Sequence, residues 1–260
     1  MTAPQFTEDP RLVFAAADFA NEAGLEGVFC FDHLVPLGDP RRPIFELTSV
    51  LGALAAKGGG VGSLVLRAPL RGPVISAAIA ATVTAVGPER FVLGLGSGDS
   101  RSRDEQRRFG LEGGSLAERI TSVESTIERV RSLAPRVPIW VGGTHPQIRR
   151  LAVARADGWN GWGIDLRRLG ELVGWFRERR PDLTLSWGGA VVAAGDRGEL
   201  ERLLDARRTP PAIAGTYPEV ARRLAETFQL GIDVAVVSIL PNRPERWRMF
   251  HREVLGRLYR

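Results

Sequence analysis

Residues 62–100 read GSLVLRAPLRGPVISAAIAATVTAVGPERFVLGLGSGDS and contain the pattern that decides the fold. Two short apolar runs, at 61–66 and 91–95, flank a helical stretch at 74–86. Strands that are apolar on both faces and separated by helices are typical of a parallel sheet covered by helices on both sides. This part of the chain therefore predicts an α/β fold.

The same alternation extends in both directions from this stretch. The expected strands are 3–6, 27–31, 61–66, 91–95, 138–141, 158–162, 183–192 and 234–240, and the expected helices are 11–23, 45–57, 74–86, 116–133, 148–155, 166–179, 218–230 and 246–258. Eight strands is the number of a (β/α)8 TIM barrel, and a chain of 260 residues suits one such barrel. We predict a single domain over 1–260 with a short or truncated first strand.

The glycines at the end of the second apolar run are also compatible with another architecture, the doubly wound sheet that binds dinucleotides. Gly94, Gly96 and Gly98 are spaced GxGxG, whereas the dinucleotide fingerprint is GxGxxG and a helix follows it at once. Here a charged stretch follows, and the motif comes late in the chain. These differences favour the barrel.

Composition limits the classes of function. The chain has 44% hydrophobic and 25% charged residues, which is typical of a globular enzyme. Its formal net charge is +5, but the arginines are interleaved with acids along the expected helices, so we expect no nucleic-acid binding. The single cysteine, Cys30, excludes an intrachain disulfide, and no apolar run approaches the ~18 residues of a membrane span. We expect a cytoplasmic protein without a membrane segment.

The residues that follow each strand are the candidates for the active site, because the loops after the strands of a parallel barrel build it. Those residues are Asp32 and His33, Arg67, Ser97, Gly98 and Asp99, Gly142, Gly143 and Thr144, and Trp159 and Trp162. They would bring a titratable pair, a second acid, a glycine turn and aromatic walls to one face.

Each of the charged candidates has two interpretations. His33 beside Asp32 supplies an imidazole that exchanges protons near neutral pH, yet such a pair also caps turns and satisfies buried backbone groups. Asp99 after Gly98 is either a second acid of the site or an ordinary turn aspartate, and these residues alone favour the turn. Asp32, Glu46 and Asp99 would serve glycoside hydrolysis if they converged.

The glycine turn and the tryptophans are similarly ambiguous. The turn formed by Gly142, Gly143 and Thr144 precedes a helix, where free N–H groups and the helix dipole hold phosphate, although a tight turn explains it equally. Trp159 and Trp162 either wall a pocket for a planar ring or pack the barrel. Phosphate-loop and zinc motifs are missing from the sequence, so we predict no metal site.

Four segments in order resemble the bacterial luciferase-like monooxygenase superfamily, and particularly its branch of F420-dependent oxidoreductases. They are ANEAGLEGVFCFDHL at 20–34, the stretch at 62–100 quoted above, VPIWVGGTHPQIRRLAVARADGWNGW at 137–162 and IAGTYPEVARRLAETFQLGIDVAVV at 213–237. The resemblance covers almost the whole chain and implies the fold of that superfamily.

The resemblance also implies roles for individual residues. His33 would match the histidine that faces the reactive ring, with Asp32 as its acidic neighbour, and Asp99 falls where several members carry a glutamate suspected of acid catalysis. Leu64 and Val65 would match a strand bulge behind the ring that is often a non-prolyl cis peptide. The residues expected at the cofactor are Leu64, Val65, Arg67, Ser97, Gly142, Gly143, Thr144 and Trp159.

The function implied is hydride transfer between coenzyme F420 and a small organic substrate, in a protein whose relatives are often homodimers. The lysine that some members use for a sugar phosphate is missing, with Gly163 and Ile164 in its region, so a sugar-phosphate substrate is not expected. Two alternatives remain open: an FMN-dependent monooxygenase of the same superfamily, and a non-catalytic barrel that has lost its cofactor.

Overall fold

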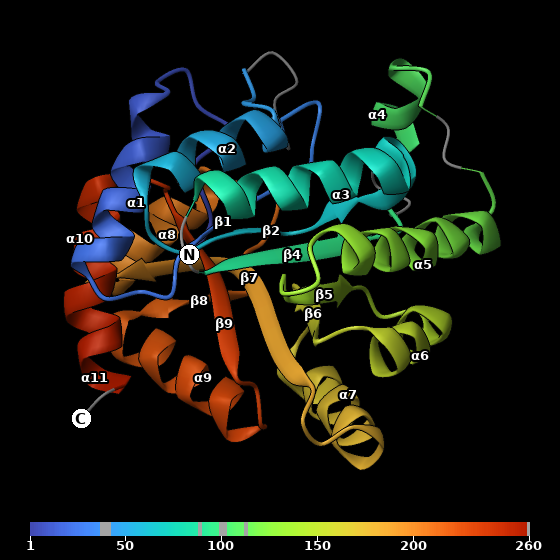
Figure 1. Ribbon diagram of the computed structural model, residues 1–260. Helices are drawn as coiled ribbons and strands as arrows, with labels where there is room; N and C mark the ends of the chain where they lie inside the picture. The colour runs from blue at the N-terminus through green and yellow to red at the C-terminus, as the bar shows by residue number, and fades with distance from the viewer. Residues whose placement is uncertain (37–42, 88–89, 99–102, 112–113, 259–260) are drawn as a thin grey trace.

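The computed structural model describes residues 1–36, 43–87, 90–98, 103–111 and 114–258. Parallel strands alternate with helices around a nearly closed barrel (Figure 1). The strands are β1 Val28–Cys30, β2 Val61–Ser63, β3 Leu66–Arg67, β4 Phe91–Gly96, β5 Ile139–Gly142, β6 Gly158–Trp162, β7 Thr184–Ala194, β8 Ile213–Thr216 and β9 Val234–Leu240. The predicted TIM barrel is confirmed.

Helices cover the outside of the ring. They are α1 Arg11–Glu22, α2 Leu47–Lys57, α3 Ala68–Val86, α4 Arg103–Arg108, α5 Leu116–Leu133, α6 Pro146–Arg155, α7 Leu166–Arg179, α8 Arg197–Asp205, α9 Tyr217–Gln229 and α10 Pro244–Phe250, followed by η2 His251–Leu255 and α11 Gly256–Leu258. α3 is kinked where Gly72 has a φ of +70° before Pro73. By length and composition α3 would also pass as a membrane span.

The ring closes through the first residues of the chain. The sheet runs β1-β2-β4-β5-β6-β7, and β9 pairs with the other edge of β7. Thr2 forms a parallel bridge with Phe29, and its N–H donates to the carbonyl of Val237 at 3.0 Å, so this segment lies between β1 and β9. The first strand is short, as predicted, but its placement at 3–6 was wrong because only Thr2 forms a bridge.

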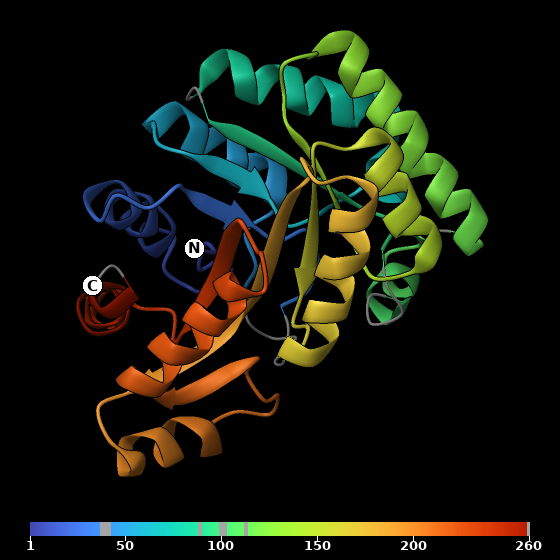
Figure 2. The ribbon, with the colours of Figure 1, turned by 90° about the horizontal axis from the view of Figure 1, so that it is seen from below.

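The non-prolyl cis peptide bond that the resemblance implied is present between Leu64 and Val65. It divides the predicted strand at 61–66 into β2 and β3. The unpredicted pair of α8 and β8 follows β7, and β8 pairs with the last four residues of that strand. Figure 2 shows α8 and β8 to one side of the ring of strands.

Large side chains fill the inside of the barrel. Phe29 and Trp140 stack with ring centroids 5.6 Å apart, and Leu64 and Val236 join the same buried cluster. Gly158 leaves room for this cluster, since a Cβ there would lie 2.4 Å from Trp140. A packed interior is usual for this fold, so a ligand has to bind at the end where the loops gather.

Candidate active site

The predicted site residues come from the carboxyl ends of neighbouring strands. Asp32 and His33 follow β1, Arg67 ends β3, Ser97 follows β4 and Gly142 ends β5. Because parallel strands all point the same way, these residues share one end of the barrel, which we call the rim. The predicted acid Asp99 lies outside the described residues.

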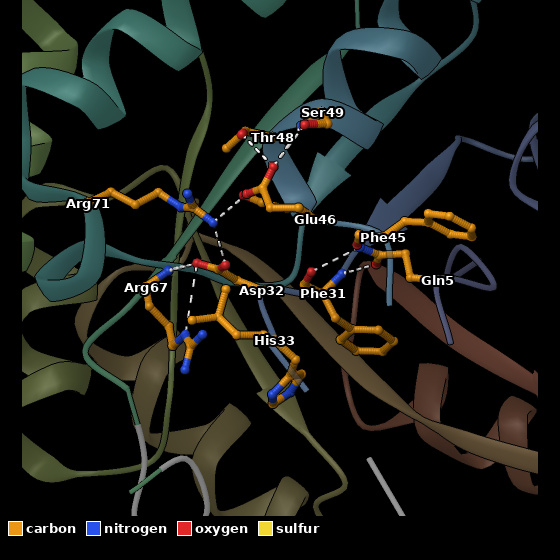
Figure 3. Close-up of polar contacts among 12 residues, drawn as sticks. Gln5, Phe31, Asp32, His33, Phe45, Glu46, Thr48, Ser49, Arg67 and Arg71 are labelled. Atoms are coloured by element: carbon orange, nitrogen blue, oxygen red, sulfur yellow. Dashed lines mark hydrogen bonds and ion pairs between the residues drawn. The ribbon is translucent and has the colours of Figure 1, made fainter. Parts of the chain in front are cut away.

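The backbone that carries Asp32 and His33 is held by a side chain instead of a neighbouring strand. Gln5 accepts from the N–H of Phe31 at 2.5 Å and donates to the carbonyl of Phe31 at 3.1 Å and of Phe45 at 3.0 Å (Figure 3). One amide thus replaces the ladder that a longer first strand would supply. Gln5 fixes the start of the site at the point where the first strand ends.

Asp32 is almost completely buried and its carboxylate is fully engaged. It accepts from the backbone N–H of Arg67 at 2.8 Å and from Nη2 of Arg71 at 2.6 Å (Figure 3). Its side chain is 1% exposed. Asp32 therefore anchors the end of β3 and the start of α3, and no hydrogen bond between it and His33 is found among the described residues.

The carboxylate that does contact His33 is Glu105, on α4. Nδ1 of His33 lies 3.1 Å from Glu105 Oε2, and the other oxygen accepts from Nη2 of Arg67 at 2.8 Å and from the N–H of Leu34. Burial by itself would raise the pKa of Glu105, but the hydrogen bonds from His33 and Leu34 and the charge of Arg67 outweigh it, so the pKa lies below its ordinary value.

Glu105 was not among the residues predicted for the site. It lies in a run of charged residues without apolar periodicity, and nothing in that run distinguishes it from Asp104 next to it. Asp104 is 95% exposed, whereas the Glu105 side chain is 5% exposed. The only signal was the position of the run, directly after the glycines of β4.

Five side chains form a line of alternating charge along the rim, which we call the charged row: Glu46, Arg71, Asp32, Arg67 and Glu105. Arg71 bridges Asp32 and Glu46, with Nη2 2.8 Å from Glu46 Oε1 (Figure 3). Glu46 also caps α2, accepting from the N–H of Ser49 at 2.9 Å. Despite partial burial, these bonds and the Arg71 charge lower the pKa of Glu46 to about 2.

Aromatic rings surround the imidazole of His33 and cover the barrel mouth. The centroids of Phe6 and Phe31 lie 6.3 Å and 6.4 Å from that of His33. Phe31 also contacts Trp162, which ends β6 on the opposite side of the barrel. The two aromatic rings pack edge-on, with their centroids 5.1 Å apart. The His33 side chain is 21% exposed and Trp162 is 40% exposed. A flat ligand would therefore lie on the rim and not inside the barrel.

Val65 and the glycines beside it form one part of the rim surface. A Cβ on Gly96 would lie 2.4 Å from Val65, and one on Gly142 would lie 2.9 Å from it. The glycines of β4 and β5 are therefore needed for the side chain of Val65 to pack. Leu64 is buried, Val65 is half-buried and Ser97, which follows β4, is buried.

The glycine turn after β5 is held by contacts from β6. Gly143 has a φ of +128°, which favours glycine, and its N–H donates to the carbonyl of Asn160 at 3.1 Å. The indole of Trp159 donates to the carbonyl of Gly143 at 2.8 Å. Thr144 is exposed, and α6 begins two residues later. The N–H of Gly143 is thus already bonded, so an anion here would be favoured chiefly by the dipole of α6.

Trp159 lies elsewhere than expected for the wall of a pocket. Its side chain is fully buried and packs against Phe176 of α7, with centroids 4.7 Å apart. It supports the turn from behind, while Trp162 is the tryptophan at the surface of the rim. Cys30 is also fully buried, and burial raises the pKa of its thiol, as expected of a small core residue.

Across the described parts of the chain, no group of three or more His, Cys, Asp or Glu side chains is placed to hold a metal ion. The carboxylates of the charged row are paired with arginines instead.

The chain belongs to the luciferase-like monooxygenase family, whose sequence model matches residues 1–136. This confirms the resemblance found in the sequence. The segment matched contains the whole charged row. No curated protein matches the chain.

Solved structures of the same fold cover almost the whole chain at low sequence identity. An F420-dependent secondary alcohol dehydrogenase, in complex with an F420-acetone adduct, has a TM-score of 0.81 and 16% identity, with 96% of each chain covered. The coenzyme F420 dependent tetrahydromethanopterin reductase from Methanopyrus kandleri has a TM-score of 0.76 and 14% identity, covering 99% of this chain and 97% of that one. Riboflavin lyase with modified FMN has a TM-score of 0.76 and 14% identity, covering 100% and 90%.

Proposed function

We propose that this protein is an F420-dependent oxidoreductase that transfers a hydride between the deazaflavin and a small organic substrate at the rim. The observation that carries the proposal is His33, a partly exposed imidazole on the rim whose Nδ1 lies 3.1 Å from the buried carboxylate of Glu105. It is supported by solved structures of this fold that hold or use F420.

The residues at the glycine turn fit an anionic cofactor. Arg149 and Arg150 lie in the first half of α6, and Arg168 lies in the first turn of α7, so positive charge gathers at helix starts that face the rim. Burial lowers the pKa of Arg149, and the charges of Arg168, Arg150 and Arg179 lower it further. An anionic tail bound at the turn would relieve this repulsion between like charges.

The charged row offers donors as well. Nε and Nη1 of Arg67 are buried without a hydrogen-bond partner among the described residues. An oxygen of a bound cofactor or substrate would find donors there.

In the proposed reaction the protein positions the substrate and manages the proton. A bound deazaflavin would supply or accept the hydride at its ring carbon. When the substrate is reduced, His33 gives a proton to the polar atom next to the carbon that receives the hydride; when the substrate is oxidised, His33 takes that proton. Phe31 and Trp162, which contact each other at the barrel mouth, would provide apolar contact to the deazaflavin ring and keep water away from one side of it.

An FMN-dependent monooxygenase is the second candidate, because the same fold holds FMN in riboflavin lyase and because a phosphate turn serves either cofactor. Fluorescence titration of the purified protein with F420 and with FMN, in parallel, separates the candidates. We expect saturable binding of F420 that is tighter than that of FMN. Tighter FMN binding would favour the monooxygenase, and binding of neither would leave the non-catalytic barrel.

A carboxylate hydrolase is disfavoured by the charged row. Asp32 and Glu46 do converge, but both carboxylates contact the same nitrogen, Nη2 of Arg71. A general acid needs a carboxyl that keeps its proton near neutral pH, whereas the pKa of Glu46 is about 2.

We also propose that two copies associate through α3. Its outer face exposes Val74, Ile75 and Val86 by more than half, and the helix has no charged residue between 72 and 87. A charged partner would find nothing to pair with, whereas the same face of a second copy offers matching apolar area in a twofold contact. Light scattering should show a dimer that Ile75→Asp converts to a monomer; a monomeric wild-type protein would contradict this.

A cytoplasmic location remains part of the proposal.

A further inference from the structure

We infer that Glu105 is a positioning residue that fixes the tautomer of His33, so that Nε2 is the nitrogen left to exchange a proton with a ligand. The catalytic consequence rests on the function proposed above, whereas the tautomer itself does not. Nothing in the sequence pattern assigned this role to Glu105.

Both oxygens of the Glu105 carboxylate accept hydrogen bonds. Oε1 accepts from two donors, the N–H of Leu34 and Nη2 of Arg67, and Oε2 faces Nδ1 of His33 at 3.1 Å. The pKa of Glu105 lies below its ordinary value, so the group is ionised at neutral pH. An ionised carboxylate accepts hydrogen bonds and donates none. Nδ1 must therefore carry the hydrogen, and in the neutral ring Nε2 carries the lone pair.

The position of Glu105 is itself determined by Arg67 and by the backbone next to His33. Arg67 holds Oε1 through its guanidinium, while its backbone N–H is bound to Asp32. Side chains of Glu105 and Arg67 are 5% and 6% exposed, so this ion pair is shielded from water and its geometry is well defined. The carboxylate also binds Leu34, the residue after His33, and so holds both the ring and the adjoining backbone.

The surroundings of the ring point in the same direction. Phe6 and Phe31 flank the imidazole and offer no hydrogen-bond acceptor. With Nδ1 occupied by Glu105, Nε2 is the polar atom of the ring that remains for a ligand. In serine proteases the wrong histidine tautomer costs roughly 10⁴-fold in turnover, which shows how much such a carboxylate can contribute.

Nitrogen-15 NMR tests the tautomer directly, without a cofactor or substrate. The chain has three histidines, so the ring signals are assigned by comparing wild type with His145→Gln and His251→Gln. Spectra are recorded at about pH 9, above the ordinary imidazole range. We expect His33 to show a protonated Nδ1 and an unprotonated Nε2. A protonated Nε2 in the wild-type protein would overturn the inference, whatever any variant does.

Variants then test whether Glu105 is the cause. Glu105→Ala should abolish the single-tautomer pattern of His33, whereas Asp104→Ala, which removes an exposed carboxylate from the same helix, should leave it unchanged. An unchanged pattern in folded Glu105→Ala would refute the role. If that variant does not fold, Glu105→Gln keeps the size of the side chain but accepts or donates at Nδ1 alike, and a mixture of tautomers is expected.

Turnover provides the link to the proposed function. In the cofactor-loaded enzyme, Glu105→Gln should lower kcat by about 10²-fold or more with a smaller change in KM, because the proton-exchanging nitrogen is no longer fixed. If the protein binds neither F420 nor FMN, the proposed function fails while the NMR result stands. If it binds cofactor and His33 has the other tautomer, only the present inference fails.

Discussion

The two halves of the rim are built in different ways. The half formed by β1 to β4 holds the charged row and His33, with buried ion pairs between segments far apart in sequence. The half formed by β5 and β6 holds the glycine turn through Trp159 and a backbone bond from Gly143, with no ion pair in the turn among the described residues. The first half is organised by charge, and the second by backbone geometry and aromatic packing.

This difference indicates a division of work. Buried charges are costly to desolvate and are stable only as a complete set, so they fix an imidazole firmly. The glycine turn lies directly before α6, where the helix dipole favours an anion. Under the proposed function, proton exchange would belong to the half with His33 and cofactor binding to the half with Gly143, and substitutions in the two halves should have different effects.

The largest effect is expected for His33→Ala. Removing the imidazole should lower kcat by about 10²- to 10⁴-fold, because a positioned acid or base contributes that much, while the Kd of the cofactor changes only a few-fold. Steady-state kinetics and fluorescence titration measure the two quantities. His251→Ala, at an exposed position far along the chain, is the control. Full turnover in His33→Ala would remove this residue from the reaction.

Substitutions in the charged row should lower the free energy of unfolding. Arg67→Met leaves Asp32 and Glu105 buried with fewer partners, and we expect a loss of about 3–5 kcal/mol in the free energy of unfolding, measured in urea. Arg168→Met, which breaks an exposed pair with Glu171, should cost about 0–1 kcal/mol. Equal losses in the two variants would show that the row is not a buried network.

Trp159→Phe should weaken cofactor binding and leave kcat nearly unchanged. It deletes one hydrogen bond to Gly143, worth about 1 kcal/mol, so cofactor affinity should fall a few-fold at nearly constant kcat. Trp187→Phe removes the matching indole bond, to the carbonyl of Ile164 and away from the turn, and should leave affinity unchanged. If both variants bind alike, the support of the turn by Trp159 has no functional weight.

The smallest effect concerns pH. The pKa of Glu46 is about 2 in the folded protein, below the ordinary value of 4.5, so its contribution to stability is present above about pH 4.5 and is lost as the pH falls towards 2. Glu46→Gln should make the thermal midpoint less dependent on pH in that window. Glu171→Gln, at an exposed pair, is the comparison. A slope as steep as that of wild type in Glu46→Gln would contradict the assignment.

Local pattern was sufficient for most of the fold. The strands near 27–31, 91–95, 158–162 and 234–240 were predicted within one or two residues, because alternation of apolar strands and helices is written in neighbouring residues. β8 was not predicted, since its four residues gain their meaning only by pairing with the extended end of β7. The first strand was misplaced for a similar reason: Gln5 replaces its ladder with a side chain.

The sequence by itself determined that Asp32, His33, Arg67 and the turn at Gly143 lie at one end of a barrel, because parallel strands deliver whatever follows them to the same rim. Only the tertiary structure decided which of them touch: Asp32 binds Arg67 and Arg71, and Glu105 takes His33. Contacts between charges depend on distances across several loops, and those distances are set by the packing of helices and strands and not by spacing along the chain.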